Sequence, residues 1–231
     1  DGDDDAVQAY GDDGDGDLQE KRSLCIGGEF DGGDCEGTDR RDDDQNWLLG
    51  LLFRLPGPPQ GPPAGATISG AWVKFINRDS DKTNFWLDIY AEKPDARDFD
   101  DNDIDGRNRI AGPVSWKVVT ERCNKNGKNC KDAKPSNDSE IQSPNIKSLV
   151  QAAVNHPSWS ATDGGDLGII MELNISKSAE ESYRNFESED TAKKYDEAPR
   201  LKLLWESPAV STPVSYLSAI RFANLGVPQG A

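Results

Sequence analysis

Apolar and polar residues alternate along several short segments of this chain, and this period of two predicts β-strands. The clearest examples are 65–75, with the sequence GATISGAWVKF, and 198–205 near the end of the chain. Segment 47–55 is almost continuously apolar, which is typical of a strand in the middle of a sheet. Further strands are predicted at 83–91, 114–120 and 167–175, and an edge strand at 6–10.

One segment has the spacing of a helix. Ser143 and Pro144 supply a cap residue and then a proline in the first turn. Apolar residues follow at helical spacing, at Ile146, Leu149, Val150 and Ala153. The helix is predicted to end at 155–157, where His156 precedes a proline. A capping role is therefore expected for His156 rather than catalysis.

The proline-rich segment 56–63 and the polar segment 92–112 are expected to be loops. Together these patterns predict an all-β fold, an antiparallel and jelly-roll-like β-sandwich with one short helix and long loops. Residues 1–205 are expected to form this module, with 206–231 as a C-terminal linker and candidate donor strand. A chain of 231 residues is long enough to bury the core of such a sandwich.

The formal net charge of −16 is concentrated at the N-terminus. Residues 1–50 hold 17 of the 42 acidic and 4 of the 26 basic residues, so the remaining chain is close to neutral. This excess repels nucleic acids and anionic lipids, and it attracts divalent cations or keeps a surface protein soluble. No apolar run approaches the roughly 18–20 residues of a membrane span. With no initial Met or signal peptide, the chain is consistent with a processed mature form.

The four cysteines form two local pairs, Cys25 with Cys35 and Cys123 with Cys130. Neither pair has the CxxC spacing of a zinc site, and the chain has one histidine. The second pair encloses Asn-Gly, which favours a tight hairpin that brings the two sulfurs together. We predict two disulfide bonds, which need an oxidising compartment.

Two Asn-x-Ser sequons start at Asn137 and Asn174. Segment 167–175 alternates so that Asn174 points outward from the predicted strand, as glycosylation requires. Sequons and disulfides together predict an extracellular, glycosylated protein at or near a cell surface.

Several short pieces occur in one order across residues 3–205. They are Asp4-Asp5, Leu49-Gly50-Leu51-Leu52-Phe53, Pro63 to Ile68, Asp103-Ile104-Asp105-Gly106-Arg107, Val114-Ser115-Trp116, Ser143-Pro144-Asn145-Ile146, Val150-Gln151, Val154 to Trp159, Arg184 to Ser188 and Ala198 to Leu201. In this order the chain resembles a secreted β-sandwich module repeated in large surface proteins of bacteria and algae. That module is distantly similar to the DNRLRE-type carbohydrate-binding modules. The resemblance implies a noncatalytic module for display, adhesion or matrix building, with glycan binding as one option. The cysteine pairs, the acidic loop 27–46 and the C-terminal tail depart from the pattern.

The long loop contains a candidate calcium site. Asp101, Asp103 and Asp105 alternate and are followed by a glycine, so their carboxylates can converge on one hard cation. Asp98, the carbonyl of Arg107 or water would supply the missing ligands. The alternative is a solvated acidic turn that binds no ion.

Two other acidic groups are candidate cation sites. Asp12, Asp13, Asp15 and Asp17 alternate without a following glycine in register, which favours a diffuse counterion cloud. A third possible site pairs Asp4 or Asp5 with Glu187, Glu189 or Asp190.

Strand 83–91 places Trp86 and Tyr90 on one face, opposite Phe85, Leu87 and Ile89. Flat apolar sugar faces pack on aromatic rings, so Trp86 and Tyr90 form a candidate glycan-stacking pair. Packing against a second sheet is the alternative, and most of the six tryptophans are expected in the core. No nucleophile elbow or phosphate-binding loop is present, and an enzyme is not expected. A glycosidase could still use some of the many carboxylates.

Beyond residue 213, apolar residues alternate in phase, at Val214, Tyr216, Ile220 and Phe222. An apolar strand needs a partner edge. It can fold back on its own module, or it can complete the sheet of a neighbouring copy in a head-to-tail assembly.

The sequence therefore predicts a noncatalytic extracellular structural or adhesive module, a subunit of a surface or filament assembly. A carbohydrate-binding module is the alternative. Other copies of the chain and glycans are the expected partners, and calcium is the expected ion.

Overall fold

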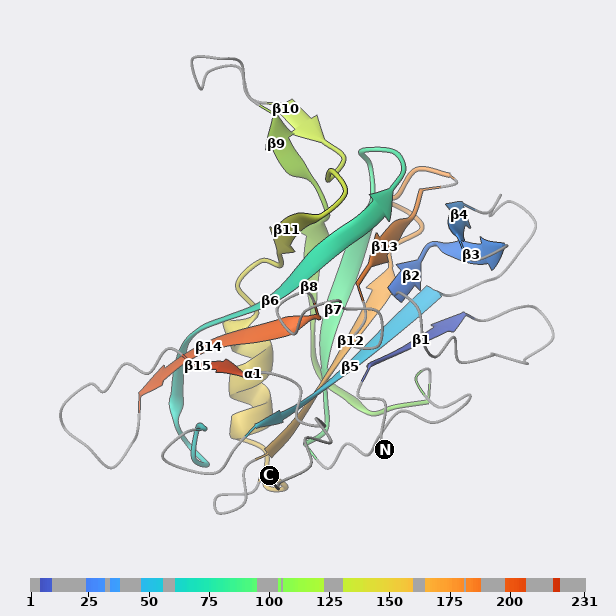
Figure 1. Cartoon of the computed structure of the whole chain (residues 1–231). Helices are drawn as coiled ribbons and strands as arrows, with labels where there is room; N and C mark the ends of the chain where they lie inside the picture. The colour runs from blue at the N-terminus through green and yellow to red at the C-terminus, as the bar shows by residue number, and fades with distance from the viewer. Residues whose placement is uncertain are drawn as a thin grey trace, which may run out of the picture.

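The computed structural model describes residues 5–9, 24–31, 34–37, 47–55, 61–94, 104, 106–122, 131–159, 165–180, 182–187, 198–206 and 218–220. Strands β1, β3, β4 and β15 are described by their backbone. The described residues form two large antiparallel sheets and a single short helix, which confirms the predicted all-β fold (Figure 1).

The first large sheet has five strands in the order β1-β5-β12-β7-β8, and all its pairs are antiparallel. These strands are β1 (Asp5–Ala9), β5 (Trp47–Leu55), β12 (Gly165–Leu173), β7 (Trp86–Glu92) and β8 (Arg109–Lys117). Strand β5 has a neighbour on both sides, as its continuous apolar run predicted, and β1 is the edge strand expected near residues 6–10.

The second large sheet has the order β15-β14-β6-β13-β2, and β11 also pairs with β6. Its strands are β15 (Ser218–Ile220), β14 (Arg200–Glu206), β6 (Thr67–Ser80), β13 (Arg184–Phe186), β2 (Leu24–Ile26) and β11 (Ser139–Gln142). Two small hairpins complete the description. They are β3 (Gly28–Asp31) with β4 (Asp34–Gly37), and β9 (Thr120–Arg122) with β10 (Lys131–Ala133).

The main core lies between the two large sheets. Strands of both sheets contribute residues to it, for example Leu49 and Leu51 of β5 and Val73 and Phe75 of β6. Phe75 stacks with Trp116 at a centroid distance of 6.0 Å. Helix α1 (Lys147–Val154) contacts β6, β7 and β8 and adds its buried apolar face to the same core. The residues predicted at helical spacing are all buried.

The segment before α1 closes the second edge of β6, and this corrects the predicted helix cap. Ser143 does not cap the helix, which begins at Lys147. Its N–H donates to the carbonyl of Val73 at 2.8 Å, and its hydroxyl accepts the Val73 N–H at 2.9 Å. Asn145 Oδ1 accepts the N–H of Ala71 at 3.1 Å in the same way.

Gln151 continues this pattern from the helix. Its side chain accepts the N–H of Ile68 and donates to the carbonyl of Ala66, each at 2.8 Å. Backbone groups that a neighbouring strand would otherwise bind are thus bonded by side chains. This protects the edge of β6 from further pairing.

Several element boundaries differ from the sequence prediction. Strand β12 ends at Leu173, and Ile175 is 55% exposed because the chain turns there instead of continuing the alternation. Strand β8 begins at Arg109, so the loop before it is shorter than predicted. The segment 25–46 was expected to be a loop, and it contains β3 and β4. Gly65 takes φ +75° in the turn that precedes β6, a conformation that favours glycine.

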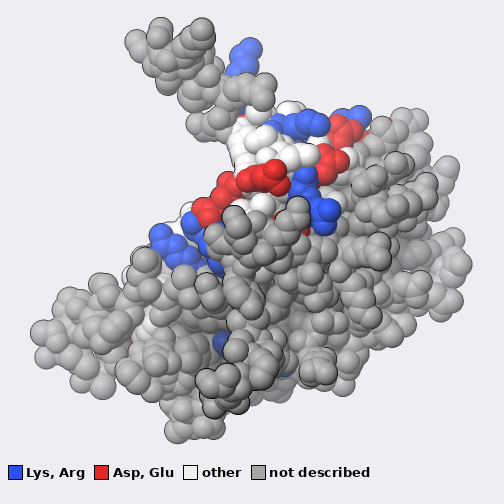
Figure 2. Space-filling view, in the orientation of Figure 1, with Lys and Arg blue, Asp and Glu red and all other residues white. Residues whose placement is uncertain are grey.

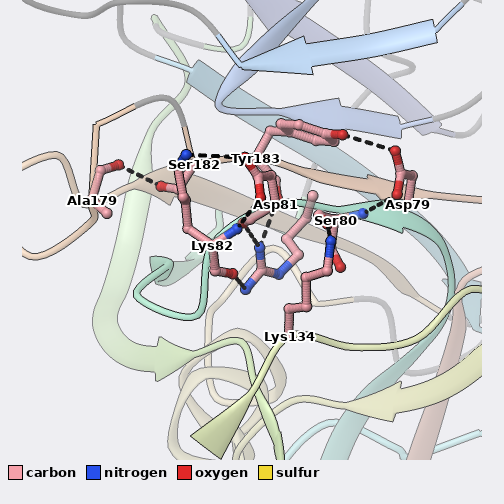
Figure 3. A network of polar contacts seen from close by, with 9 residues as sticks. Asp79, Ser80, Asp81, Lys82, Lys134, Ala179, Ser182 and Tyr183 are labelled. Atoms are coloured by element: carbon pink, nitrogen blue, oxygen red, sulfur yellow. Dashed lines mark hydrogen bonds and ion pairs between the residues drawn. The ribbon is translucent and has the colours of Figure 1, made fainter.

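A buried arginine joins β13 to β8 and to the turn after β6. Arg184 is fully buried, and its guanidinium donates to four carbonyl oxygens, those of Asp81, Lys82, Val118 and Tyr183, with shortest distances of 2.7 Å. Its Cζ lies 4.7 Å from the ring centroid of Phe85. Beside it, the Tyr183 hydroxyl donates to Asp79 at 2.8 Å (Figure 3). Burial lowers the pKa of Arg184 to about 10, so it remains charged at neutral pH.

Candidate functional site

The outward face of β7, β8 and β12 carries the aromatic residues that the sequence proposed for sugar stacking. Trp86 and Tyr90 point away from the core, because Leu87 and Ile89 between them are buried. Across the ladder, Trp86 lies opposite Lys117 of β8, and Tyr90 lies opposite a residue of β12. The two aromatic side chains therefore share one face, as the alternation predicted.

Trp86 is surrounded by polar groups. Its indole Nε1 donates to Asn84 Oδ1 at 3.0 Å. The ammonium groups of Lys117 and Lys177 lie 5.9 and 5.5 Å from its ring centroid. The side chain is half-buried and lies outside both apolar clusters, so it does not pack against the second sheet. Both ammonium groups are attracted to the negative face of the indole, which is partly exposed to solvent.

Asp88 connects the polar groups next to Trp86. One carboxylate oxygen accepts a hydrogen bond from the Ser115 hydroxyl, and the other accepts one from Asn174 Nδ2 at 2.7 Å. The Lys177 ammonium reaches the Ser115 hydroxyl at 3.2 Å. The surface beside Trp86 thus offers a carboxylate, an amide, a hydroxyl and an ammonium, groups that can bind the hydroxyls of a sugar.

Tyr90 has a different environment. The guanidinium of Arg109 lies 4.7 Å from its ring centroid and also donates to Glu172 at 2.9 Å. Burial raises the pKa of Tyr90, and the negative charges of Glu172 and Asp88 add to this effect. The ring packs against a second apolar cluster, formed by Leu48, Leu52, Ile104 and Ile170. Both side chains are half-buried, and Tyr90 packs on an apolar cluster of its own chain, whereas Trp86 lies outside both clusters.

The predicted calcium loop is described only at Ile104 and from 106 onward. Ile104 is fully buried in the second cluster, and Arg107 Nη1 contacts both carboxylate oxygens of Glu92 at 3.2 Å. This ion pair is buried, with side-chain exposures of 5% and 8%. It leaves no room for a side chain at Gly168, where a Cβ would lie 2.3 Å from Glu92 Oε2. The loop is thus fastened to the outward face of the sheet.

The candidate ligands Asp98, Asp101, Asp103 and Asp105 lie outside the described residues. Within the described part of the chain, no group of three or more His, Cys, Asp or Glu side chains could hold a metal ion. The calcium site therefore stays a prediction.

Cys25 is fully buried on β2 and is disulfide-bonded. Cys35 lies on β4 opposite Phe30, but its side chain is outside the description, so the pairing with Cys25 stays a prediction. Cys123 and Cys130 are outside the described residues, and they directly follow β9 and precede β10, which pair with each other.

Both sequon asparagines are described. Asn137 is exposed in the turn before β11. Asn174 is half-buried and lies just after β12. It starts a turn in which its backbone carbonyl accepts hydrogen bonds from the N–H groups of Lys177 and Ser178. It projects on the outward face, as predicted, although the strand ends one residue before it.

The tail contributes a strand to its own module. Strand β15 pairs with β14 in the register Leu201↔Ile220, Lys202↔Ala219 and Leu203↔Ser218. The other proposed contact residues, Val214, Tyr216 and Phe222, lie outside the described residues.

Trp72, one of the six tryptophans of which most were expected in the core, lies on the outward face of the second sheet. It is half-buried, and its ring covers Gly70, where a Cβ would lie 2.3 Å from Trp72 Cη2. The Lys202 ammonium is 5.2 Å from the ring centroid. The alternation along the strand predicts this outward position, because Trp72 falls between the inward-facing Ala71 and Val73.

Charges of both signs lie next to each other on the same face of the second sheet. Glu140 of β11 bonds both Lys74 and Arg200, at 2.5 and 2.9 Å. Figure 2 shows basic and acidic side chains interspersed over the described part of its view. This part of the surface has no extended area of one charge in that view, unlike the strongly acidic N-terminal sequence.

Asn155 is the C-cap residue of α1, and His156 follows it; the Nδ1 of His156 accepts the N–H of Ser158 at 3.1 Å. No helix in the described part of the chain is long and apolar enough to cross a membrane.

The fold and this surface define an all-β, sandwich-like protein with two outward-facing tryptophans on opposite sheets. Comparison with models of known protein families and with curated proteins finds no match for the chain.

Proposed function

We propose that the chain is a noncatalytic structural or adhesive module of an extracellular or cell-surface assembly. Its copies join head to tail when the C-terminal strand of one copy pairs with β14 of the next. The observation that carries the proposal is the pairing of the tail with the edge of β14, described above within one chain.

Two other sheet edges are poorly suited to pair with a strand from a neighbouring copy, which supports β14 as the contact. The second edge of β6 is bonded by Ser143, Asn145 and Gln151. Strand β8, at the edge of the first sheet, contains Pro113, which has no N–H to offer a further strand. Both edges are thus unsuited to accept another chain.

Strand β14 has the features of an acceptor. It runs over seven residues with one irregularity in its pairing with β6, between Leu204 and Trp205 and beyond the residues that pair with the tail. Leu201, Leu203 and Trp205 alternate into the core. The tail pairs with only Leu201 to Leu203 of it, after a connection of residues 207–217 that contains two prolines. A strand attached through such a connection can bind its own β14 or that of a neighbour, because both make the same backbone hydrogen bonds.

Exchange of this kind builds a filament. The donor is the tail and the acceptor is β14, so the two contact surfaces differ and the contact does not close on itself unless a ring forms. Deletion of residues 208–231 should abolish assembly, measured by light scattering and by electron microscopy of the purified protein. Assembly of the truncated chain at the same concentration and rate as the full chain would contradict the proposal.

A carbohydrate-binding module is the second candidate, favoured by Trp86 and the polar groups around Asp88. Saturable binding to an insoluble polysaccharide or glycan array, lost in Trp86→Ala, would support it. Trp72→Ala is the matched control, because Trp72 is also outward-facing and half-buried beside a lysine, but on the opposite sheet. Equal loss in both variants would indicate nonspecific adsorption to exposed indoles.

A further inference from the structure

Asn174 and Trp86 are direct neighbours on the outward face of the first sheet. The ladder between β12 and β7 runs to Leu173↔Leu87, and it continues with the Asn174 N–H, which donates to the carbonyl of Trp86 at 2.9 Å. Side chains opposite each other on adjacent strands have Cβ atoms about 4.5–5.5 Å apart. A group attached to Asn174 therefore starts within reach of the indole.

The amide of Asn174 is held in one orientation. Its Oδ1 accepts hydrogen bonds from the Ser176 hydroxyl at 2.8 Å and from the Lys177 N–H at 3.1 Å. Its Nδ2 donates to Asp88 at 2.7 Å. A carboxamide nitrogen carries two hydrogens. One of them binds Asp88, so substitution of the other keeps this hydrogen bond.

We propose that an N-linked sugar on Asn174 packs against the indole of Trp86, so that the chain's own glycan occupies the candidate stacking surface. This rests on the proposed extracellular location, where a lipid-linked oligosaccharide diphosphate is the glycosyl donor. In the transfer, Nδ2 forms a bond to C1 of the first sugar, the bond from C1 to the diphosphate breaks, and Nδ2 loses one proton.

The surroundings of Trp86 suit a sugar. The apolar face of a pyranose packs on the indole, and its hydroxyls can bind the polar groups beside it. Lys177 is exposed and now lies near the ring, so the sugar displaces its ammonium while Lys117 stays paired with Asp132 at 2.6 Å. The candidate site is then filled within the molecule and is not a receptor for an external polysaccharide.

Asn137 provides an internal control. It is exposed in the turn before β11, which belongs to the second sheet, whereas Trp86 lies on β7 of the first sheet. Ser139→Ala removes its sequon and leaves that of Asn174. Ser176→Ala does the reverse.

The test compares the same protein variant with and without a sugar on Asn174. Ser139→Ala protein is secreted from a eukaryotic host and trimmed with an endoglycosidase to a single N-acetylglucosamine, and the same variant is made unglycosylated in a bacterial periplasm. We expect a sugar on Asn174 by peptide mapping, nuclear Overhauser contacts between sugar protons and the Trp86 ring, and a Tm about 2–4 °C higher than without the sugar.

In the Trp86→Ala variant, the sugar on Asn174 should no longer raise the Tm. A single sugar on Asn137, present in the Ser176→Ala variant, should not raise the Tm either. The inference is overturned if Asn174 is unoccupied while Asn137 is glycosylated, or if the sugar raises Tm equally with and without Trp86. Assembly is tested separately, by comparison of the unglycosylated full chain with an unglycosylated chain that lacks residues 208–231. A failed sugar contact thus leaves the head-to-tail proposal intact.

Discussion

Replacement of Arg184 by methionine should strongly destabilise the fold. The arginine side chain is completely buried and donates to four backbone carbonyls, which belong to the turn after β6, the end of β8 and β13 itself. Methionine has a similar length and fills much of the same space, so the variant removes the hydrogen bonds and the charge with little change in packing.

The change in the free energy of unfolding follows from two opposing effects. The Val118 carbonyl is buried, the bonds to the other three carbonyls are partly exposed, and that of Tyr183 also accepts the Asp81 N–H. A buried acceptor left without a donor costs about 1–3 kcal/mol, so the loss of these bonds costs at most roughly 12 kcal/mol. Removal of a buried guanidinium recovers a desolvation penalty of several kcal/mol. We expect a net loss of about 3–5 kcal/mol in the free energy of unfolding, which is a large part of the roughly 5–15 kcal/mol that stabilises a typical domain.

Urea denaturation followed by tryptophan fluorescence measures this loss. Arg184→Lys is the control, since it keeps the charge but cannot reach carbonyls on four residues, and it should be destabilised as well. The folded pKa of Arg184, about 10, lies below its unfolded value because of burial, so this residue makes stability rise with pH only above about pH 10. The loss in free energy of unfolding of the Arg184→Met variant, relative to the parent, should therefore be constant from about pH 6 to 9. A variant within about 0.5 kcal/mol of the parent would refute the reasoning.

Three further results are expected. Gly168→Ala should lower stability by about 1–3 kcal/mol in a thermal melt, because the new methyl group meets Glu92; an unchanged Tm would show that Glu92 moves freely. Excess chelator should lower the Tm if the loop 98–107 binds calcium, and an unchanged melt with no metal by elemental analysis would remove that prediction. Nonreducing peptide mapping should join Cys25 to Cys35, and a peptide that joins Cys25 to any other cysteine would contradict the local pairing.

The sequence predicted the fold class because several strands bury every second residue in the core between the sheets, and this gives a period of two in β6, β7 and β14. The residues Phe85, Leu87 and Ile89 are buried as the pattern required, and Trp86 and Tyr90 face outward. The position of Trp72 could have been read from the same alternation. Its apolar character led to a core assignment, although the neighbouring residues already occupied the inward positions.

Other features depend on contacts between distant segments. Ser143 was read as a helix cap because serine commonly caps helices, but its partner is Val73, 70 residues earlier. Local spacing cannot distinguish these two partners. The buried cage of Arg184 joins segments up to 103 residues apart, and nothing in its local sequence marks the residue as buried. The cover over Tyr90 likewise arises because the long loop returns to the sheet at Ile104.

The head-to-tail contact is tested most directly by cysteine pairs at the register of β14 and β15. Lys202 lies opposite Ala219, so one preparation carries Lys202→Cys and a second, distinguishable by mass, carries Ala219→Cys. Lys74→Cys on β6 replaces Lys202→Cys in the control, since Lys74 pairs with Arg200 of β14 and is not opposite the tail. We expect mild oxidation of the first mixture to give a disulfide-linked heterodimer, mapped to residues 202 and 219, and the control mixture to give none. A Lys202→Cys/Ala219→Cys double variant that closes only within single chains, together with no heterodimer in the mixture, would contradict the head-to-tail proposal.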